Sequence, residues 1–469
     1  MNRRSFLKNG TCGMMSSLPA INTIMNLTLA NNLVQAQSAP GEDYKALICL
    51  FLNGGNDSFN MLIPTTPDEF GLYAQTRSNV GLQLPSAAGE PFNPSAALPL
   101  NVTNTPGRTF AIHPSLPDLA ALFNQGDASF VANIGTLVEP IPSVAAFKSG
   151  SYRIPVALGA HNTQQIAWQT GMPQKASHNT GWFGRTADIL SSRVNPGSAL
   201  PMSFALSSTK GINQGVNNGG LAIGATGIEL LDNVDFKDQW FKTEFEAQQS
   251  RLYQNIFQRV HRDKIDEYSD LANTFQTEYN KTATTTTFSG NLSATFRSIA
   301  RTIAMRNVFN VKRQTFFINF EGFDGHASLL ANQATLLTQV NLALKQFWAE
   351  MGARSLRDKV TVFTGSDFGR TLRSNGSGTD HAWGGNAFVM GGAVNGGKIL
   401  GNYPTLLKLG DGLDLSTNGN LLPTTSVDSY YADLLLWFGV PRSDLPQVLP
   451  NIGNFYDVNS TSTPLGIFT

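Results

Sequence analysis

Short apolar runs that end in glycine and polar residues most constrain how this chain can fold. The first runs without interruption from Lys45 to Leu52 and is followed by Asn-Gly-Gly-Asn-Asp. Such runs are typical of strands that are buried on both faces, as in a parallel sheet. Similar runs occur at 128–134, 202–206, 314–320, 360–364 and 387–390.

Helical patterns lie between these runs, at 116–123, 329–351 and 427–438. Alternating strands and helices predict an α/β fold with a mainly parallel, doubly wound sheet flanked by helices. The segment 235–310 breaks this alternation, because it is charged and helical in period with a threonine-rich turn at 282–287. We expect it to form a helical hairpin packed beside the sheet.

The N-terminus has the features of an export signal. Arg3-Arg4 is soon followed by Phe-Leu-Lys, which resembles a twin-arginine signal, an address read by the translocase and not an anchor. The weakly apolar stretch at 12–29 is too short and too polar to span a membrane. We expect residues 1–36 to be removed and residues 37–469 to form one periplasmic or otherwise exported domain without a transmembrane anchor. The alternative is a disordered basic N-terminus.

Composition excludes some function classes. The chain has 33 basic and 33 acidic residues and no run of Lys or Arg, which argues against nucleic acid as a partner, because counterion release needs clustered cations. Charged residues make up 14% and apolar residues 41%, which indicates a large buried core. Cys12 lies in the predicted signal, so Cys49 would be alone in the mature chain and form no intramolecular disulfide. We expect it to be an unreactive core residue.

Acidic and imidazole side chains recur just after the predicted strands. These residues are Asp57, Asp324, His326, Asp367 and His381. In open α/β sheets, sites form beyond the carboxyl ends of the strands, and carboxylate oxygens with neutral imidazoles are ligands of divalent metals. Taken singly, such an Asp is more often a helix N-cap and such a His a hydrogen-bonding loop residue. Their recurrence at successive strand ends, in a chain with six histidines, predicts one shared metal site.

Four motifs carry a family resemblance, and a helix at 427–438 fits it as well. They are Leu52-Asn-Gly-Gly-Asn-Asp-Ser-Phe-Asn60, Phe323-Asp-Gly-His326, Ser366-Asp-Phe-Gly-Arg-Thr371 and Asn375-Gly-Ser-Gly-Thr-Asp-His381. The chain resembles an exported bacterial family described as domain of unknown function 1501, over essentially the whole mature chain. That family is similar to the alkaline phosphatase and sulfatase superfamily, so the resemblance implies an alkaline-phosphatase-like fold.

The resemblance also implies how the metal ligands are divided. Asp57 and Asp367 resemble ligands of one metal ion, and Asp324, His326 and His381 resemble ligands of a second. The chain departs from the superfamily pattern in two places. Phe368 stands where the phosphatases commonly have His, and the Asp-Gly-His spacing is shorter than theirs. Both departures argue against a full two-metal site.

The candidate nucleophile is sought in the segment 160–163. The segment Ala160-His-Asn-Thr163 occupies the place where sulfatases carry Cys-x-Pro-Ser-Arg, and its lack of Cys argues against a formylglycine sulfatase. Members of the resembling family often have Ser-His here. Thr163, Ser58 or a metal-bound water could replace the missing hydroxyl, with His161 beside it. Alternatively, His161 caps a helix and the site only binds.

Arg370 completes the set of candidate catalytic residues. Its guanidinium could clamp a phosphate or sulfate oxygen beside the metal, or pair with a carboxylate. The sequence therefore predicts an exported hydrolase of phosphate or sulfate esters, with one or two divalent metal ions (Zn, Ca, Mg or Mn) and an anionic small molecule or glycan ester as substrate. The alternative is a non-catalytic exported protein of the same fold that binds an anionic glycan or envelope component.

Overall fold

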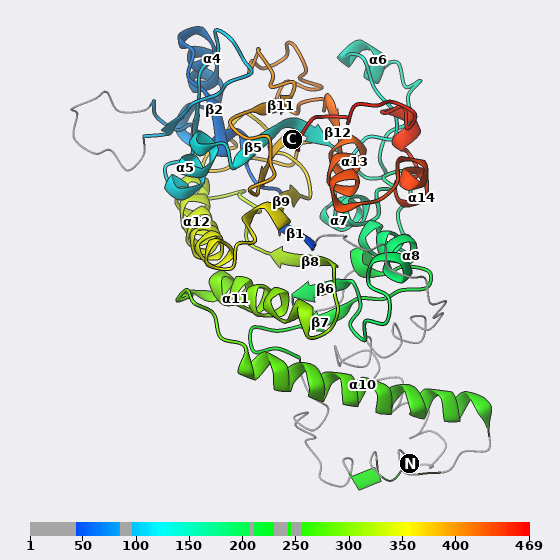
Figure 1. Ribbon diagram of the computed structural model, residues 1–469. Coiled ribbons are helices and arrows are strands. Elements are labelled where there is room, and N and C mark those ends of the chain that lie inside the picture. Colours follow the sequence, from blue (N-terminus) through cyan, green and yellow to red (C-terminus); the bar gives the residue numbers. More distant parts are fainter. Residues whose placement is uncertain are drawn as a thin grey trace, which may run out of the picture.

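The computed structural model describes residues 44–84, 96–206, 211–228 and 255–469, together with residues 243, 244, 247 and 251. The predicted export signal lies outside the described residues, as does most of the first part of the 235–310 segment. In the described part of the chain, helices lie on both sides of one large sheet (Figure 1).

Nine strands form this sheet within the described residues, in the order β11-β5-β10-β9-β1-β8-β6-β7, with β12 also paired to β5. Their bounds are β1 (Lys45–Leu52), β5 (Ala128–Gly135), β6 (Ser203–Leu206), β7 (Leu221–Ile223), β8 (Arg313–Phe320), β9 (Val360–Ser366), β10 (Gly385–Met390), β11 (Ile399–Gly401) and β12 (Thr425–Ser426). The predicted strands are all confirmed. A small antiparallel sheet, in the order β2-β4-β3, contains β2 (Leu62–Pro64), β3 (Leu98–Leu100) and β4 (Phe110–Ile112).

The large sheet is mainly parallel, as predicted, with β10 as the antiparallel member. β10 pairs antiparallel with both β5 and β9, whereas the other strand pairs are parallel. Parallel neighbours need a crossover, usually through a helix. The connection 367–384 between β9 and β10 contains no helix, so β10 returns beside β9 in the opposite direction.

Alternate residues of the central strand β1 enter two hydrophobic cores. Ile48 and Leu50 pack in one core with the helices α5 (Pro117–Gln125), α11 (Asn291–Ala304) and α12 (Leu329–Ala353). Leu47 and Phe51 pack in the other core with the helices α7 (His161–Thr170), α8 (Trp182–Val194), α13 (Val427–Phe438) and α14 (Leu445–Val448). Figure 1 shows these two sets of helices on opposite sides of the sheet. Burial on both faces explains why β1 is apolar throughout.

The helices close to this sheet include those predicted from sequence periodicity. Their bounds are α3 (Ser58–Met61), α4 (Pro67–Arg77), α5 (Pro117–Gln125), α6 (Val144–Lys148), α7 (His161–Thr170), α8 (Trp182–Val194), α10 (Ile256–Lys281), α11 (Asn291–Ala304), α12 (Leu329–Ala353), α13 (Val427–Phe438) and α14 (Leu445–Val448). Of the helices in the described part of the chain, none combines the length and the apolar character that a bilayer crossing requires.

The predicted helical hairpin is observed in its described part as α10 and α11. Phe275 of α10 and Phe296 and Ile299 of α11 are buried in the core that also holds α12, so both helices pack against this core. Cys49 is a free, buried cysteine of β1, and burial raises the pKa of its thiol. It is the unreactive core residue that the sequence predicted.

Candidate metal centre

The candidate site lies where the carboxyl ends of β9, β1 and β8 meet at the centre of the sheet. These strands are adjacent and parallel, so the segments that follow them at 53–57, 321–328 and 367–384 lie at one edge. The first turn of α7 joins them, because the Nδ1 atom of His161 lies 2.7 Å from Oδ2 of Asp367. The sheet order thus brings together loops that are far apart in the sequence.

Three imidazoles and one carboxylate form a cluster there, which we call the histidine cluster: His161, Asp324, His326 and His381. The Nε2 atoms of His326 and His381 are 2.9 Å apart. Oδ1 of Asp324 lies 3.2 Å from Nε2 of His326 and 3.4 Å from Nε2 of His381. Its other oxygen lies 3.5 Å from Nε2 of His161. The ligand atoms of His161, Asp324 and His381 all lie within 4.8 Å of one another, and Nε2 of His326 lies beside the last two.

Each ring of the histidine cluster has an oxygen against its other nitrogen. Nδ1 of His161 faces Asp367 at 2.7 Å, and Nδ1 of His381 faces the carbonyl oxygen of Gly159 at 2.8 Å. Nδ1 of His326 faces Oδ1 of Asp380 at 3.2 Å. A carbonyl or carboxylate oxygen accepts hydrogen bonds, so the closer contacts of His161 and His381 favour a proton on Nδ1 of these two rings. His326 has a carboxylate oxygen 3.2 Å from each of its two nitrogens.

The 2.9 Å contact between Nε2 of His326 and Nε2 of His381 can be made in two ways. A proton on one of these Nε2 atoms forms a hydrogen bond between the rings, whereas two rings protonated on Nδ1 need a cation between their lone pairs. Burial lowers the pKa of His381 below its usual value, which disfavours its protonated form. In a tetrahedral zinc site the ligand atoms lie about 3.3 Å apart, given bonds of about 2.0 Å, so the observed spacings suit a shared cation.

Asp367 holds His161 in place from beneath the cluster. It is fully buried, and its two oxygens accept hydrogen bonds from the backbone N–H of Gly54 at 3.2 Å and from His161. Gly54 has a φ of 118°, and a Cβ atom there would lie 2.4 Å from the backbone nitrogen of Asp324. Only glycine allows the β1 and β8 loops to approach this closely. Asp367 thus supports His161 and is not itself in the cluster.

Arg370 contacts the cluster through Asp324. Its Nη1 donates to Oδ1 of Asp324 at 2.8 Å, and its Nη2 donates to the carbonyl oxygen of Thr379. Burial alone would raise the pKa of Asp324, but the hydrogen bond and charge of Arg370 outweigh it and hold the pKa below its usual value. The buried guanidinium of Arg370 thus pairs with a carboxylate, the second of the two roles considered from the sequence.

Asp57 lies at the end of β1 but outside the histidine cluster. Its Oδ2 atom accepts hydrogen bonds from Arg77 at 2.6 Å and from the hydroxyl of Thr379 at 3.0 Å. Both charged side chains of this ion pair are fully buried. The structure therefore brings Asp324, His326 and His381 together, adds His161 to them, and places Asp57 and Asp367 in supporting contacts.

Phe368, which follows Asp367, packs against the histidine cluster. Its ring packs against the imidazoles of His161 and His381, with centroid separations of 4.8 and 4.4 Å. It is almost completely buried and forms an apolar surface against the two rings. A phenyl ring offers no ligand atom, so position 368 contributes no metal donor beside Asp367.

The two hydroxyls considered as nucleophiles have other partners. Oγ1 of Thr163 donates toward the carbonyl oxygens of Ala157 and Ala160, both at 3.0 Å. Oγ of Ser58 is buried and accepts from the backbone N–H of Asn386 at 2.7 Å. His161 is the first residue of α7, whose N-cap is Ala160, so its ring does not cap the helix and instead enters the cluster.

A comparison with protein families matches residues 44–411 to the family described as protein of unknown function (DUF1501). The chain belongs to this family. No curated protein sequence matches this DUF1501 protein.

Several solved structures are similar to this DUF1501 protein at low identity. A sulfatase from Pseudoalteromonas sp. is 11% identical, with 92% of this chain and 72% of that chain covered and a TM-score of 0.34. The soluble domain of lipooligosaccharide phosphoethanolamine transferase A from Neisseria meningitidis is 11% identical, with 87% and 91% covered and a TM-score of 0.33. A protein in the alkaline phosphatase superfamily from Vibrio parahaemolyticus is 10% identical, with 89% and 75% covered and a TM-score of 0.31. At TM-scores this low, the similarity says nothing about the chemistry of the site.

Sequence reasoning missed three residues of the DUF1501 site. Asp380 precedes His381 and supports His326, and a hydrogen bond from Asn375 lowers the pKa of its carboxyl. Gln165 donates to Asp367, and Arg77 pairs with Asp57. Asp380 lies in the motif 375–381, next to His381, so its position in the sequence could have identified it as a site residue. Gln165 and Arg77 come from helices and reach the site only through tertiary packing.

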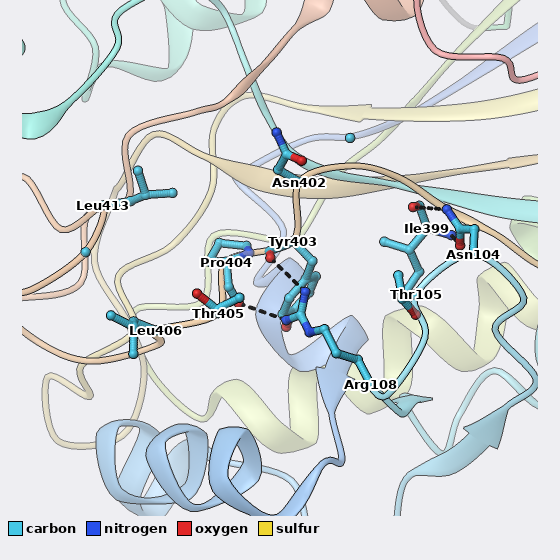
Figure 2. A pocket seen from close by; sticks show the side chains of 12 residues that line it. Asn104, Thr105, Arg108, Ile399, Asn402, Tyr403, Pro404, Thr405, Leu406 and Leu413 are labelled. Carbon is cyan, nitrogen blue, oxygen red and sulfur yellow. Dashed lines mark hydrogen bonds between the residues drawn. The ribbon is translucent and has the colours of Figure 1, made fainter.

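A cleft of about 460 Å³ lies elsewhere in this DUF1501 protein, beside β11 at the edge of the sheet. Figure 2 shows Arg108 in this cleft, donating to the backbone oxygens of Tyr403 and Pro404. Its guanidinium also pairs with Glu69 at 2.8 Å. These internal contacts use Arg108 to hold the segment after β11, and no residue of the histidine cluster lines the cleft.

Proposed function

We propose that this protein is an exported, metal-dependent hydrolase of phosphate or sulfate esters, whose histidine cluster holds one divalent cation. One observation carries the proposal: the ligand atoms of His161, Asp324 and His381 lie within 4.8 Å of one another with Nε2 of His326 beside them, while each ring has its Nδ1 against an oxygen. Metal-ligating histidines usually donate their second N–H to such an oxygen. Surface histidines have no physical need for this arrangement.

The donor set favours zinc among the cations considered from the sequence. Calcium and magnesium prefer sites built from oxygen ligands, whereas three imidazoles and one carboxylate suit zinc or another transition metal. His161, Asp324, His326 and His381 would hold the cation. Asp57, bound to Arg77 and Thr379, would not, which supports one bound cation and not two.

A cation at this position supplies Lewis acidity, which polarises the ester and makes an attacking water more acidic. The protein supplies the geometry around it. Asp367 keeps His161 oriented, Asp380 keeps His326 oriented, and Arg370 keeps Asp324 ionised. Because the Thr163 and Ser58 hydroxyls bind backbone groups, we assign the attack to water and not to a side chain.

A second candidate function rests on the same contacts. The Thr163 hydroxyl and the Arg370 guanidinium have partners within the protein, so neither is directed to a substrate. This favours a non-catalytic exported protein that binds an anionic glycan or envelope component through its cation. The motif Arg3-Arg4 near the N-terminus supports export through the twin-arginine translocase in both cases.

Metal analysis of the exported protein, combined with an ester panel, separates these proposals. The panel contains aryl phosphate, bis-aryl phosphate and aryl sulfate, and is assayed with His381→Ala and with His178→Ala. His178 contacts Thr180 outside the cluster and serves as the matched control. We expect one zinc per chain and turnover in the control, and neither in His381→Ala. Metal without turnover of any ester supports the binding protein, and a metal-free wild type refutes both proposals.

A further inference from the structure

A row of three side-chain amides runs from Asp367, beside the histidine cluster, along the carboxyl ends of β1 and β8. We call it the amide row: Gln165, Asn53 and Asn319, ending at Glu321. Nε2 of Gln165 lies 3.0 Å from Oδ2 of Asp367 and 2.8 Å from Oδ1 of Asn53. Nδ2 of Asn53 donates to Asn319 at 3.0 Å, and Nδ2 of Asn319 donates to Glu321 at 3.1 Å.

Both ends of the amide row are carboxylates, which fixes the direction of every hydrogen bond. A carboxylate only accepts, so a chain between two carboxylates needs one group that donates in both directions. Asn53 and Asn319 use different atoms for their two neighbours, whereas Gln165 uses one atom, Nε2, for both. An amide nitrogen has two hydrogens and can donate twice. Gln165 is therefore the point where the donor direction reverses.

Gln165 and His161 act on the same oxygen from the same helix. They are four residues apart on α7 and so lie on one face of it, and both contact Oδ2 of Asp367. The backbone N–H of Gly54 binds the other oxygen at 3.2 Å. With three donors around it, the Asp367 carboxylate is fixed in rotation, and its position dictates that His161 carries its proton on Nδ1.

We propose that Gln165 is a positioning residue of the metal centre, which sets the tautomer of His161 through Asp367 and thereby aims the Nε2 lone pair at the cation. This rests on the proposed function for the cation, but the tautomer itself is a property of the metal-free protein. Glutamate at this position would set a carboxylate against Asp367, and methionine would remove the donor with little change in size. The amide is thus the group that the position requires.

The test uses the full chain with Gln165→Met and, as matched control, Gln169→Met one turn further along α7. Long-range proton–nitrogen spectra of the metal-free protein, assigned with His161→Gln, report which ring nitrogen of His161 is protonated. Zinc affinity is measured by chelator competition. We expect the Nδ1–H form in wild type and control, and mixed tautomers with a 10–100-fold weaker zinc affinity in Gln165→Met.

An unchanged His161 tautomer and zinc affinity in Gln165→Met would overturn the proposal. If that variant does not fold, Asn53→Ala, which loosens Gln165 from the other side, must shift the tautomer in the same direction or the proposal also fails. If wild type binds no zinc, the proposed function fails while the tautomer still decides the role of Gln165.

Discussion

His326 and His381 present their Nε2 atoms to one another at 2.9 Å, although Asp380 and Gly159 occupy the opposite sides of the two rings. This contact needs either a proton on one Nε2 atom or a metal ion between the two rings. The pH dependence of zinc affinity distinguishes the two.

Zinc affinity should fall as the pH drops below about 6.5, because the rings must be neutral to bind a metal and a free imidazole takes up a proton near that pH. The lowered pKa of His381 keeps that ring neutral to a lower pH than an ordinary histidine. Chelator competition between pH 5 and 8 measures the effect, and His326→Ala should make it shallower. An affinity that does not change with pH would contradict the ligand assignment.

Asp57→Ala should destabilise the protein by about 3–5 kcal/mol, because it leaves the buried Arg77 without its partner. Zinc stoichiometry, measured on the folded variant at low temperature, should stay at one per chain. Urea unfolding gives the first quantity and elemental analysis the second. A fall from two ions to one would instead make Asp57 a ligand, as the superfamily resemblance implied.

His113 should make the fold less stable in acid. Burial lowers the pKa of His113 to about 4, whereas a histidine in the unfolded chain titrates near 6.5. Between these values the unfolded state takes up a proton that the folded state does not, so stability falls as the pH drops from 6.5 to 4, by up to about 3 kcal/mol. In His113→Asn, whose amide oxygen can accept from Ser115 in place of Nδ1, the difference in unfolding free energy between pH 7 and 4.5 should shrink. An unchanged difference would show that other groups cause it.

Asp428 should make the fold less stable as the pH rises, whereas His113 makes it less stable as the pH falls. Burial raises the pKa of Asp428 to about 7, and its Oδ1 atom is buried without a hydrogen-bond partner among the described residues. Above the unfolded value near 3.9 the unfolded chain releases a proton that the folded state retains, so this group costs stability as the pH rises toward 7. Asp428→Asn should therefore stabilise the protein by about 1–3 kcal/mol at pH 8 and by less at pH 5, as measured by urea unfolding. Equal effects at both pH values would contradict the assignment.

Replacing Arg3 and Arg4 together by lysine should stop export, because the twin-arginine translocase reads that pair as an address. Cell fractionation followed by immunoblotting should show the unprocessed chain in the cytoplasm. Asn2→Lys, which adds a charge but leaves the pair intact, serves as the control. Normal export of the double variant would favour a disordered basic N-terminus.

The large elements could be predicted because burial leaves a clear pattern. β1 is buried on both faces and therefore reads as one apolar run, and α13 was predicted with its observed bounds of Val427 and Phe438. The direction of β10 could not be predicted, since a buried apolar run has the same pattern in a parallel and in an antiparallel strand. It depends on the connection 367–384, which lacks a crossover helix.

The candidate site was predictable in position but not in side-chain direction. Asp324, His326 and His381 follow strands whose ends meet, so their convergence follows from the sheet. Asp57 also follows such a strand, yet its carboxylate binds Arg77 of α4 outside the cluster. His161 enters the cluster because α7 packs against this edge. Contacts of this kind depend on how helices pack, which periodicity does not record.

The pairing of β1 has a consequence for how the chain is made. Lys45 pairs with Arg313 on one side and Ala46 pairs with Val360 on the other, so the central strand meets both neighbours only after most of the chain has left the ribosome. At roughly 5–20 residues per second, this strand waits some tens of seconds in the cell without its partners. Contacts of such long range also slow folding itself. A chaperone that shields the first apolar segment during synthesis would therefore matter more to this protein than to one whose neighbouring strands follow each other in order.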